Sequence, residues 1–215
     1  PKYRCDKRPV IAFAKDEAFC FIYSENTDLL EKLGCEIRYF SPLNDHEIPS
    51  DADGIIFSGG YPELYAARLS ENISMLESIR KHAGKGIPII AECGGFMYLH
   101  ETLENSEGEQ FDMAGLIRGK AFSTEKLQRF GYITMTAGKD NLLVRKDDKI
   151  KAHEFHYWDS TECGDAFEAF KANGKHWRCV NADDNIYAGF PHIYFYGCIS
   201  AAERFVMKCA EYGGK

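Results

Sequence analysis

Residues 87–99 have the sequence IPIIAECGGFMYL, and the organisation of the chain can be worked out from this stretch. It begins as a short β-branched apolar run, which has the composition of a buried strand. Cys93 and a Gly-Gly pair follow, and the residues after them can start a helix. A side chain at such a corner points out at the carboxyl end of a sheet, where open α/β sheets hold their ligands and hydrolases place a nucleophile.

Cys93 is therefore a candidate nucleophile. Gly94 and Gly95 permit a tight turn and let a substrate approach the backbone closely. The amides at the start of the following helix favour the thiolate over the thiol. The alternative interpretation is a structural cysteine at an ordinary strand end, because free cysteine is among the most buried residue types.

The composition places the chain in a broad class. A chain of 215 residues with 45% hydrophobic and 27% charged residues is long enough for a substantial globular core. The net charge of −7 argues against a nucleic-acid partner, which requires a basic surface. No apolar run approaches the length of a membrane span, and no signal-peptide core is present. We therefore expect a soluble protein without a membrane partner.

The cysteines favour a reducing environment. None of the eight forms a Cys-x-x-Cys pair, so the sequence supports neither a zinc ribbon nor a thioredoxin motif. The absence of a secretory signal predicts reduced thiols and a cytoplasmic location.

Strand-like and helical segments alternate over the first hundred residues. Strands are expected at residues 8–14, 35–40, 53–58 and 87–91, with helices over 24–33 and 70–82. This alternation predicts right-handed βαβ crossovers and a mostly parallel sheet.

The later part of the chain has a different pattern, in which short strand-like runs precede a closing helix at 200–207. The runs lie at residues 130–135, 149–158, 166–170, 177–180 and 186–195. We expect a single α/β domain over residues 1–215, with an open, mostly parallel sheet, flanking helices and a smaller antiparallel extension.

A second Gly-Gly pair, Gly59-Gly60, ends the third expected strand at the same edge of the sheet as Cys93. The amides of Gly60 and Gly94 could then face one oxygen, as an oxyanion hole for acyl transfer requires. The alternative is a turn that needs only a positive φ angle.

A thiol nucleophile also needs a base. The sequence offers seven histidines: His46, His82, His100, His153, His156, His176 and His192. His153 and His156 are one residue short of a His-Glu-x-x-His motif, and a strand would place their rings on opposite faces, so we expect no metal site. His192 lies just before the last helix, and a base from a distant loop is common in cysteine enzymes. A structural histidine is the alternative for His192.

The chain also resembles a known family. The segments DEAFCF (16–21), GGYPEL (59–64), AECGGFMYL (91–99) and HEFHY (153–157) are similar, in this order, to the glutaminase domain of cobyrinic acid a,c-diamide synthases. These domains are class I glutamine amidotransferases of the cobyric acid synthase subgroup. The resemblance spans essentially the whole chain and implies the corresponding α/β fold.

The resemblance implies roles for particular residues. Cys93 would attack the carboxamide of glutamine, form a glutamyl thioester and release ammonia, with His192 as the base. Gly60 and Gly94 would supply the oxyanion amides, and Tyr61 would help to bind glutamine. The residues expected to support the site or face a partner are Glu63, Glu92, His153, Glu154 and His156. A purely structural role is the alternative for Tyr61 and for the three glutamates.

The resemblance also implies a partner. In full-length enzymes of this family, ammonia passes to an ATP- and Mg²⁺-dependent synthetase domain, which amidates the a and c carboxylates of a corrinoid in cobalamin biosynthesis. This chain contains no phosphate-binding Gly-x-x-x-x-Gly-Lys-Ser/Thr stretch. We therefore expect the synthetase domain, with its ATP and Mg²⁺, to be absent from this chain, and no cofactor in the glutaminase domain. The alternatives are another acceptor, such as nickel sirohydrochlorin or a cell-wall precursor, or a non-catalytic docking domain for a synthetase.

Two residues depart from the family pattern. Tyr194 lies two residues beyond His192, where the common class I triad has a glutamate and closer relatives have a second histidine. Ala152 stands where a glycine is more familiar. The group that orients the His192 ring must therefore be a backbone carbonyl or another acid.

Overall fold

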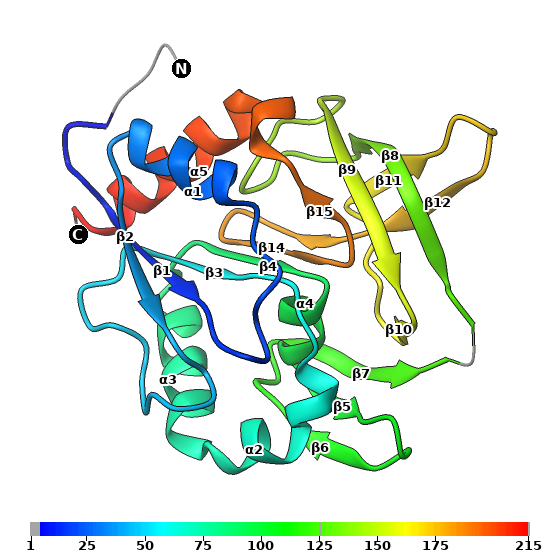
Figure 1. Cartoon of the computed structure of the whole chain (residues 1–215). Helices are drawn as coiled ribbons and strands as arrows, with labels where there is room; N and C mark the ends of the chain where they lie inside the picture. Colours follow the sequence, from blue (N-terminus) through cyan, green and yellow to red (C-terminus); the bar gives the residue numbers. More distant parts are fainter. Residues whose placement is uncertain (1–4, 125, 215) are drawn as a thin grey trace.

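The computed structural model describes residues 5–124 and 126–214. Its central element is a six-stranded sheet with the strand order β13-β14-β4-β3-β1-β2 (Figure 1). The edge strand β13 is antiparallel to β14, and the other neighbours are parallel. The strands are β1 (Val10–Ala14), β2 (Glu36–Phe40), β3 (Gly54–Phe57), β4 (Ile89–Glu92), β13 (Asn181–Ala182) and β14 (Ile186–Gly189). The predicted mostly parallel α/β sheet is confirmed.

Helices cover both faces of this sheet because its buried strands present apolar side chains to both sides. Along β1, Ile11 and Phe13 pack in one apolar cluster, whereas Ala12 and Ala14 pack in the other. The first cluster includes α1 (Ser24–Lys32) and α5 (Ile199–Tyr212). The second includes α2 (Ala66–Glu71), α3 (Ile73–Gly84) and α4 (Gly94–Tyr98), with the short 3₁₀ helix η1 (Pro62–Tyr65) nearby.

The helix predicted over residues 70–82 is divided at Asn72, so that prediction was wrong in its extent. The Asn72 side chain accepts a hydrogen bond from Met75 N at 3.4 Å and caps α3. Its amide donates to the carbonyls of Pro42 and Asp45 at 2.8 Å each. These bonds to a distant loop offset the loss of helical backbone at residue 72.

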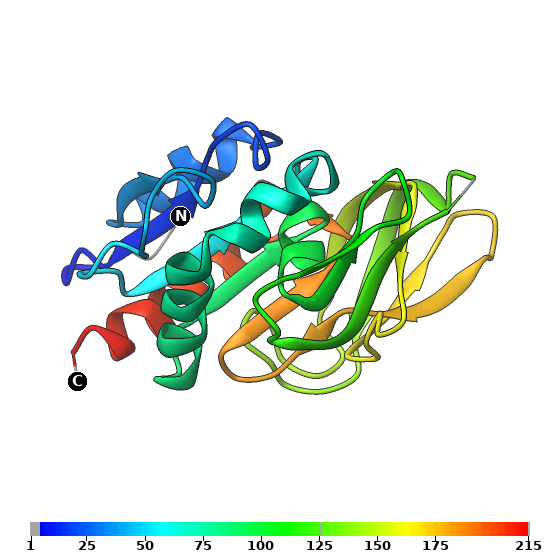
Figure 2. The same cartoon turned by 90° about the horizontal axis from the view of Figure 1, so that it is seen from below.

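The antiparallel extension consists of two sheets, which lie beside the parallel sheet and its helices (Figure 2). One has the order β10-β7-β5-β6 and includes a parallel pair, β5 with β7. Its strands are β5 (His100–Glu104), β6 (Gln110–Asp112), β7 (Ile117–Ser123) and β10 (Trp158–Ser160). His100 thus opens a strand directly after α4. The prediction of a largely antiparallel extension is confirmed.

The other sheet has the order β12-β11-β8-β9-β15 and is antiparallel throughout. Its strands are β8 (Arg129–Ala137), β9 (Lys149–His156), β11 (Phe167–Phe170), β12 (His176–Cys179) and β15 (His192–Ile193). The strand-like run predicted at 186–195 is broken at Phe190 and Pro191, between β14 and β15. Proline cannot donate to a sheet ladder. The chain therefore leaves the parallel sheet here and joins the antiparallel one.

None of the helices in the described part of the chain combines the length and the apolar character needed to cross a membrane. The eight cysteines, all of which lie among the described residues, are free thiols.

Candidate active site

Cys93 occupies a strained corner between β4 and α4. Its φ and ψ angles are +49° and −106°, a conformation that residues other than glycine rarely adopt. The backbone holds it in place, because Cys93 N donates to Gly189 O at 2.8 Å and Met97 N donates to Cys93 O at 2.9 Å. This strand-to-helix corner directs the side chain out at the carboxyl end of the sheet, as in a nucleophile elbow.

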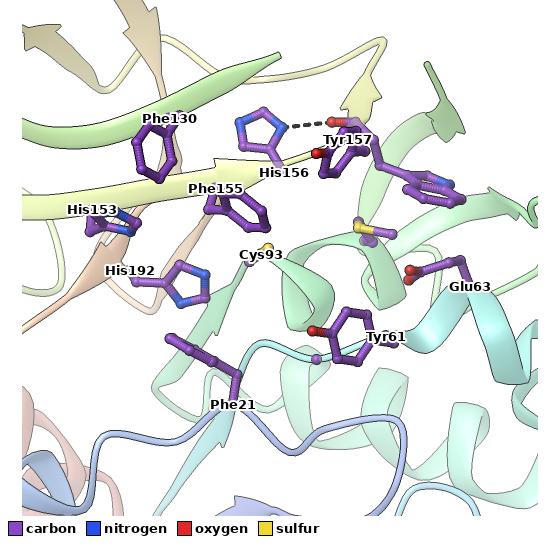
Figure 3. Close-up of a pocket in the computed structure, with 13 residues that line it drawn as sticks. Phe21, Tyr61, Glu63, Cys93, Phe130, His153, Phe155, His156, Tyr157 and His192 are labelled. Carbon is purple, nitrogen blue, oxygen red and sulfur yellow. Dashed lines mark hydrogen bonds between the residues drawn. The ribbon is translucent and has the colours of Figure 1, made fainter. Parts of the chain in front are cut away.

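The side chain of Cys93 lines a cavity of about 320 Å³, a size suited to a small molecule. Figure 3 shows the sulfur near the centre of the cavity, with the Phe155 and Tyr61 rings on opposite sides of it. The lining residues are Phe21, Gly60, Tyr61, Glu63, Cys93, Met97, Phe130, His153, Phe155, His156, Tyr157, Trp158 and His192.

The two Gly-Gly pairs lie against each other beside the sulfur. A Cβ atom on Gly94 would lie 2.8 Å from Pro62 Cδ and 3.0 Å from Gly60 N, so only glycine allows this close approach. Gly60 has a φ angle of +155°, and a Cβ there would lie 2.1 Å from Ala18 O. The structure thus brings Gly60 and Gly94 to one side of the Cys93 corner.

The segment of residues 16–21 holds the Gly59-Gly60 loop in place. The Asp16 carboxylate accepts hydrogen bonds from the backbone N–H groups of Ala18 and Phe19, at 2.9 and 3.1 Å. In turn, Ala18 O accepts from Tyr61 N at 2.9 Å. The sequence singled out this segment as a motif but gave it no role, because its partners are far away along the chain.

His192 reaches Cys93 from β15, and Figure 3 shows its ring turned toward the sulfur. The ring is only 5% exposed. One edge packs on the Phe21 ring, with centroids 4.8 Å apart, and a Cβ on Gly59 would lie 2.5 Å from His192 Cε1. Phe21 and Gly59 therefore shape the position of the ring, a role that sequence reasoning missed.

The charge of His192 depends on two anionic neighbours. Burial lowers its pKa, but the Cys93 sulfur and the Glu92 carboxylate both favour the imidazolium and together raise the pKa to about 10. Nδ1 of His192 lies 3.8 Å from Oε2 of Glu92. The arrangement can therefore hold a thiolate–imidazolium pair at the edge of the cavity.

His153 and His156 both line the cavity but differ in their surroundings. His153 pairs with His192 across β9 and β15, and burial, followed by the nearby His192, lowers the pKa of His153. His156 is buried, stacks on Phe190 with centroids 3.9 Å apart, and donates from Nδ1 to Trp158 O at 2.6 Å. Among the described residues, no group of three or more His, Cys, Asp or Glu side chains is placed to hold a metal ion.

Glu154 does not line the cavity, although its neighbour His156 does. It is 1% exposed and shares a face of β9 with the core residues Ile150 and Ala152. Its Oε2 lies 3.8 Å from Nε2 of His156, and neither carboxylate oxygen has a hydrogen-bond partner among the described residues.

Glu63 enters the cavity from η1, on the other side of the sulfur from His192 (Figure 3). Burial raises its pKa to about 7, although a backbone hydrogen bond acts in the opposite direction. Below about pH 4.5 the carboxyl is protonated whether the chain is folded or unfolded, whereas above about pH 7 the folded chain must hold a buried carboxylate.

We therefore expect Glu63→Gln to become more stable relative to the unchanged protein as the pH rises through this window. The relative gain in free energy of unfolding should be about 3 kcal/mol between the two ends of the window. Urea unfolding of both proteins at each end measures it, and an equal difference at both ends would contradict the prediction.

Comparison with known proteins places this geometry in a family. A sequence model described as a CobB/CobQ-like glutamine amidotransferase domain matches residues 10–197. The cobyrinate a,c-diamide synthase of Caldanaerobacter subterraneus is 39% identical over 220 residues, which cover 98% of this chain and 47% of that protein. The enzyme of the same name from Fusobacterium nucleatum is 42% identical over 200 residues, covering 91% and 44%. This chain therefore spans about half the length of the curated relatives that it matches.

Solved structures share the fold at lower sequence identity. PurLQS from Thermotoga maritima superposes with a TM-score of 0.64 at 18% identity, covering 95% of this chain and 99% of that chain. A structure titled as a glutamine amidotransferase gives a TM-score of 0.61 at 13% identity, with coverage of 95% and 99%. The fold and the sequence matches agree with the resemblance noted from the four motifs: the chain belongs to the family of CobB/CobQ-like glutamine amidotransferase domains.

Proposed function

We propose that this domain hydrolyses glutamine through a Cys93 thioester and supplies ammonia for the ATP-dependent a,c-diamidation of cobyrinic acid. The observation that carries the proposal is the pairing of the Cys93 sulfur with the His192 ring in one cavity. It occurs in a chain that is about 40% identical, over nearly its whole length, to cobyrinate a,c-diamide synthases.

The proposed reaction begins when Sγ of Cys93 attacks the carboxamide carbon of glutamine. The carbonyl oxygen becomes an oxyanion, which the amides of Gly60 and Gly94 stabilise. His192 donates its proton to the leaving nitrogen, the C–N bond breaks, and ammonia leaves a glutamyl thioester. His192 then removes a proton from water, which attacks the thioester and releases glutamate and the Cys93 thiol.

We assign Tyr61 and Glu63 to the amino-acid end of glutamine. Both line the cavity, and Figure 3 shows the Glu63 carboxylate on the side away from His192. The α-ammonium group of glutamine would offset the cost of burying the Glu63 carboxylate, which the free cavity does not offset.

The partner of the domain is proposed to be an ATP- and Mg²⁺-dependent synthetase part, since the matched relatives are about twice as long as this chain. Unusually exposed aromatic side chains line the cavity or, in the case of Tyr132, pack on the lining residue His153. We call these residues the aromatic rim: Phe21, Tyr61, Phe130, Tyr132, Phe155 and Tyr157. A partner seated on the rim would receive ammonia directly and shield it from water.

Tyr132 offers a test of this docking face, because it is 84% exposed at the outer edge of the rim on β8. Tyr132→Glu should weaken binding to a separately expressed synthetase part by about tenfold or more, as expected for loss of a buried interface aromatic. Isothermal titration calorimetry measures the affinity. Alkylation of Cys93 in the free domain serves as the control and should not change, and unchanged affinity would contradict the docking face.

The acceptor is tested by reconstitution with the synthetase part, ATP, Mg²⁺ and glutamine. Mass spectrometry should detect the a,c-diamide when cobyrinic acid is the acceptor. Preferential amidation of nickel sirohydrochlorin or of a cell-wall precursor would redirect the proposal to that acceptor. If 6-diazo-5-oxo-norleucine failed to label Cys93 in the complex, the domain would be a docking module and not a glutaminase.

A further inference from the structure

His192 needs a group that fixes the direction of its ring, and Tyr194 is not suited to this role. Tyr194 is 41% exposed, and its ring packs against Tyr23 and Tyr196, with centroids 5.8 and 6.0 Å away. A phenol also supplies no negative charge to balance an imidazolium. The carboxylate that usually follows the histidine by two residues must therefore be replaced from elsewhere.

Glu92 reaches the ring from β4. Its Oε2 lies 3.8 Å from His192 Nδ1, and its Oε1 accepts a hydrogen bond from Ile193 N at 2.9 Å. The side chains of Glu92 and His192 are 12% and 6% exposed, so water screens the pair only weakly. Nδ1 has no hydrogen-bond partner among the described residues, which leaves it free to donate to this carboxylate.

We propose that Glu92 is the positioning residue of the reaction, holding His192 Nδ1–H so that Nε2 faces the Cys93 sulfur. This inference rests on the proposed role of Cys93 as nucleophile. The distance of 3.8 Å is that of an ion pair and is longer than a hydrogen bond. Catalytic hydrogen bonds are often this long in ligand-free enzymes and shorten when substrate binds.

The backbone explains how neighbouring residues can flank one ring. In a regular strand Glu92 and Cys93 would point to opposite faces. The positive φ angle of Cys93 breaks this alternation, and the bond from Ile193 N fixes the carboxylate beside β15. One corner of the chain thus provides both the nucleophile and the group that orients its base.

The charges around the pair favour the same arrangement. The titratable groups that face His192 are Cys93, Glu92 and His153. His153 lies opposite His192 on the neighbouring strand β9, and a charge on it would disfavour the His192 imidazolium. Glu92 is in turn near Tyr23 and, on β14, Tyr187. The pKa of each phenol is raised, first by burial and then by the Glu92 charge, so both stay neutral. Glu92 therefore favours the imidazolium form of His192 beside the Cys93 sulfur.

The test is the pH dependence of Cys93 alkylation by iodoacetamide, measured by mass spectrometry of the Cys93 peptide with exposed Cys20 as internal reference. The unchanged protein should react at a nearly constant rate from neutral pH to about pH 10, because His192 stays an imidazolium beside the sulfur over this range. Near neutral pH, Glu92→Gln should react at about one tenth of the rate of the unchanged protein, or more slowly still. It should approach the original rate in alkaline solution, above the ordinary cysteine pKa of about 8.5, where a thiol ionises without help from an imidazolium. Its kcat for glutamine should fall by a similar factor with little change in KM.

Two further variants complete the test. Glu101→Gln changes a carboxylate that accepts from a backbone amide, Gly119 N at 2.7 Å, outside the site, and should alkylate like the unchanged protein. Glu92→Asp keeps the charge and should regain part of the reactivity near neutral pH. A wild-type profile for Glu92→Gln, or a loss by the same factor at every pH, would overturn the proposal. Alkylation needs no glutamine turnover, so failure of the proposed function would not obscure this result.

Discussion

Replacing Cys93 with alanine is expected to abolish glutamine-dependent amidation while ammonia-dependent amidation by the reconstituted enzyme continues. The sulfur is the only atom of the protein that bonds to the substrate carbon in the proposed reaction, so its loss should reduce glutamine hydrolysis by more than about 10⁴-fold. The cavity is not needed when ammonia is supplied directly. The measurement compares the rate of amide formation with glutamine and with ammonium salts at equal saturation of the synthetase part.

The matched control is Cys20→Ala, which removes an exposed thiol close to the site in sequence but not in the cavity lining. It should retain both activities. If Cys93→Ala lost the ammonia-dependent reaction as well, with its fold intact by circular dichroism, Cys93 would be needed for more than glutamine hydrolysis and the division into glutaminase and synthetase parts would be wrong.

Replacing His192 with asparagine should lower kcat for glutamine by roughly 10³-fold, within the usual contribution of a general acid–base group. Without the ring, no group protonates the leaving nitrogen and no imidazolium stabilises the thiolate. The His192 ring contacts Phe21 and Gly59. Asparagine is smaller than histidine and should not clash with either residue, so the surrounding backbone should stay in place. Steady-state release of glutamate by the reconstituted enzyme measures the effect.

His176→Asn is the control, because His176 is an exposed histidine on β12 that pairs with Glu168 at 2.9 Å. This variant should keep the original kcat. An unchanged kcat in His192→Asn would instead show that another group serves as the base, with His153 and His156 as the other histidines that line the cavity.

The parts of the fold that depend on local pattern could be predicted from the sequence. The apolar run before Cys93 and the Gly-Gly pair after it define a strand, a tight turn and a helix start within a few residues. The division of the helix at Asn72 could not be predicted in this way, since the bonds that stabilise it go to the carbonyls of Pro42 and Asp45. The helical spacing of apolar residues gives no sign of the break, because the bonds that cause it join Asn72 to a distant loop.

The same distinction applies to the site. From the residues alone, His192 was one of several histidines, because its position depends on the crossing at Pro191 and on pairing with β9. Glu92 and Glu154 both lie in motifs of the family resemblance, yet Glu92 faces the His192 ring and Glu154 faces the core. Which glutamate approaches the His192 ring depends on contacts between two sheets, and no local pattern records them.

The crossing between β14 and β15 has a mechanical consequence. The sulfur is attached to the parallel sheet and the imidazole to the antiparallel one, so any rotation of one sheet against the other changes their separation. The aromatic rim residues on β8 and β9 belong to the sheet that carries the imidazole. A protein bound there would contact the sheet that carries His192. Its binding could therefore change the distance between the base and the sulfur, and with it the reactivity of Cys93.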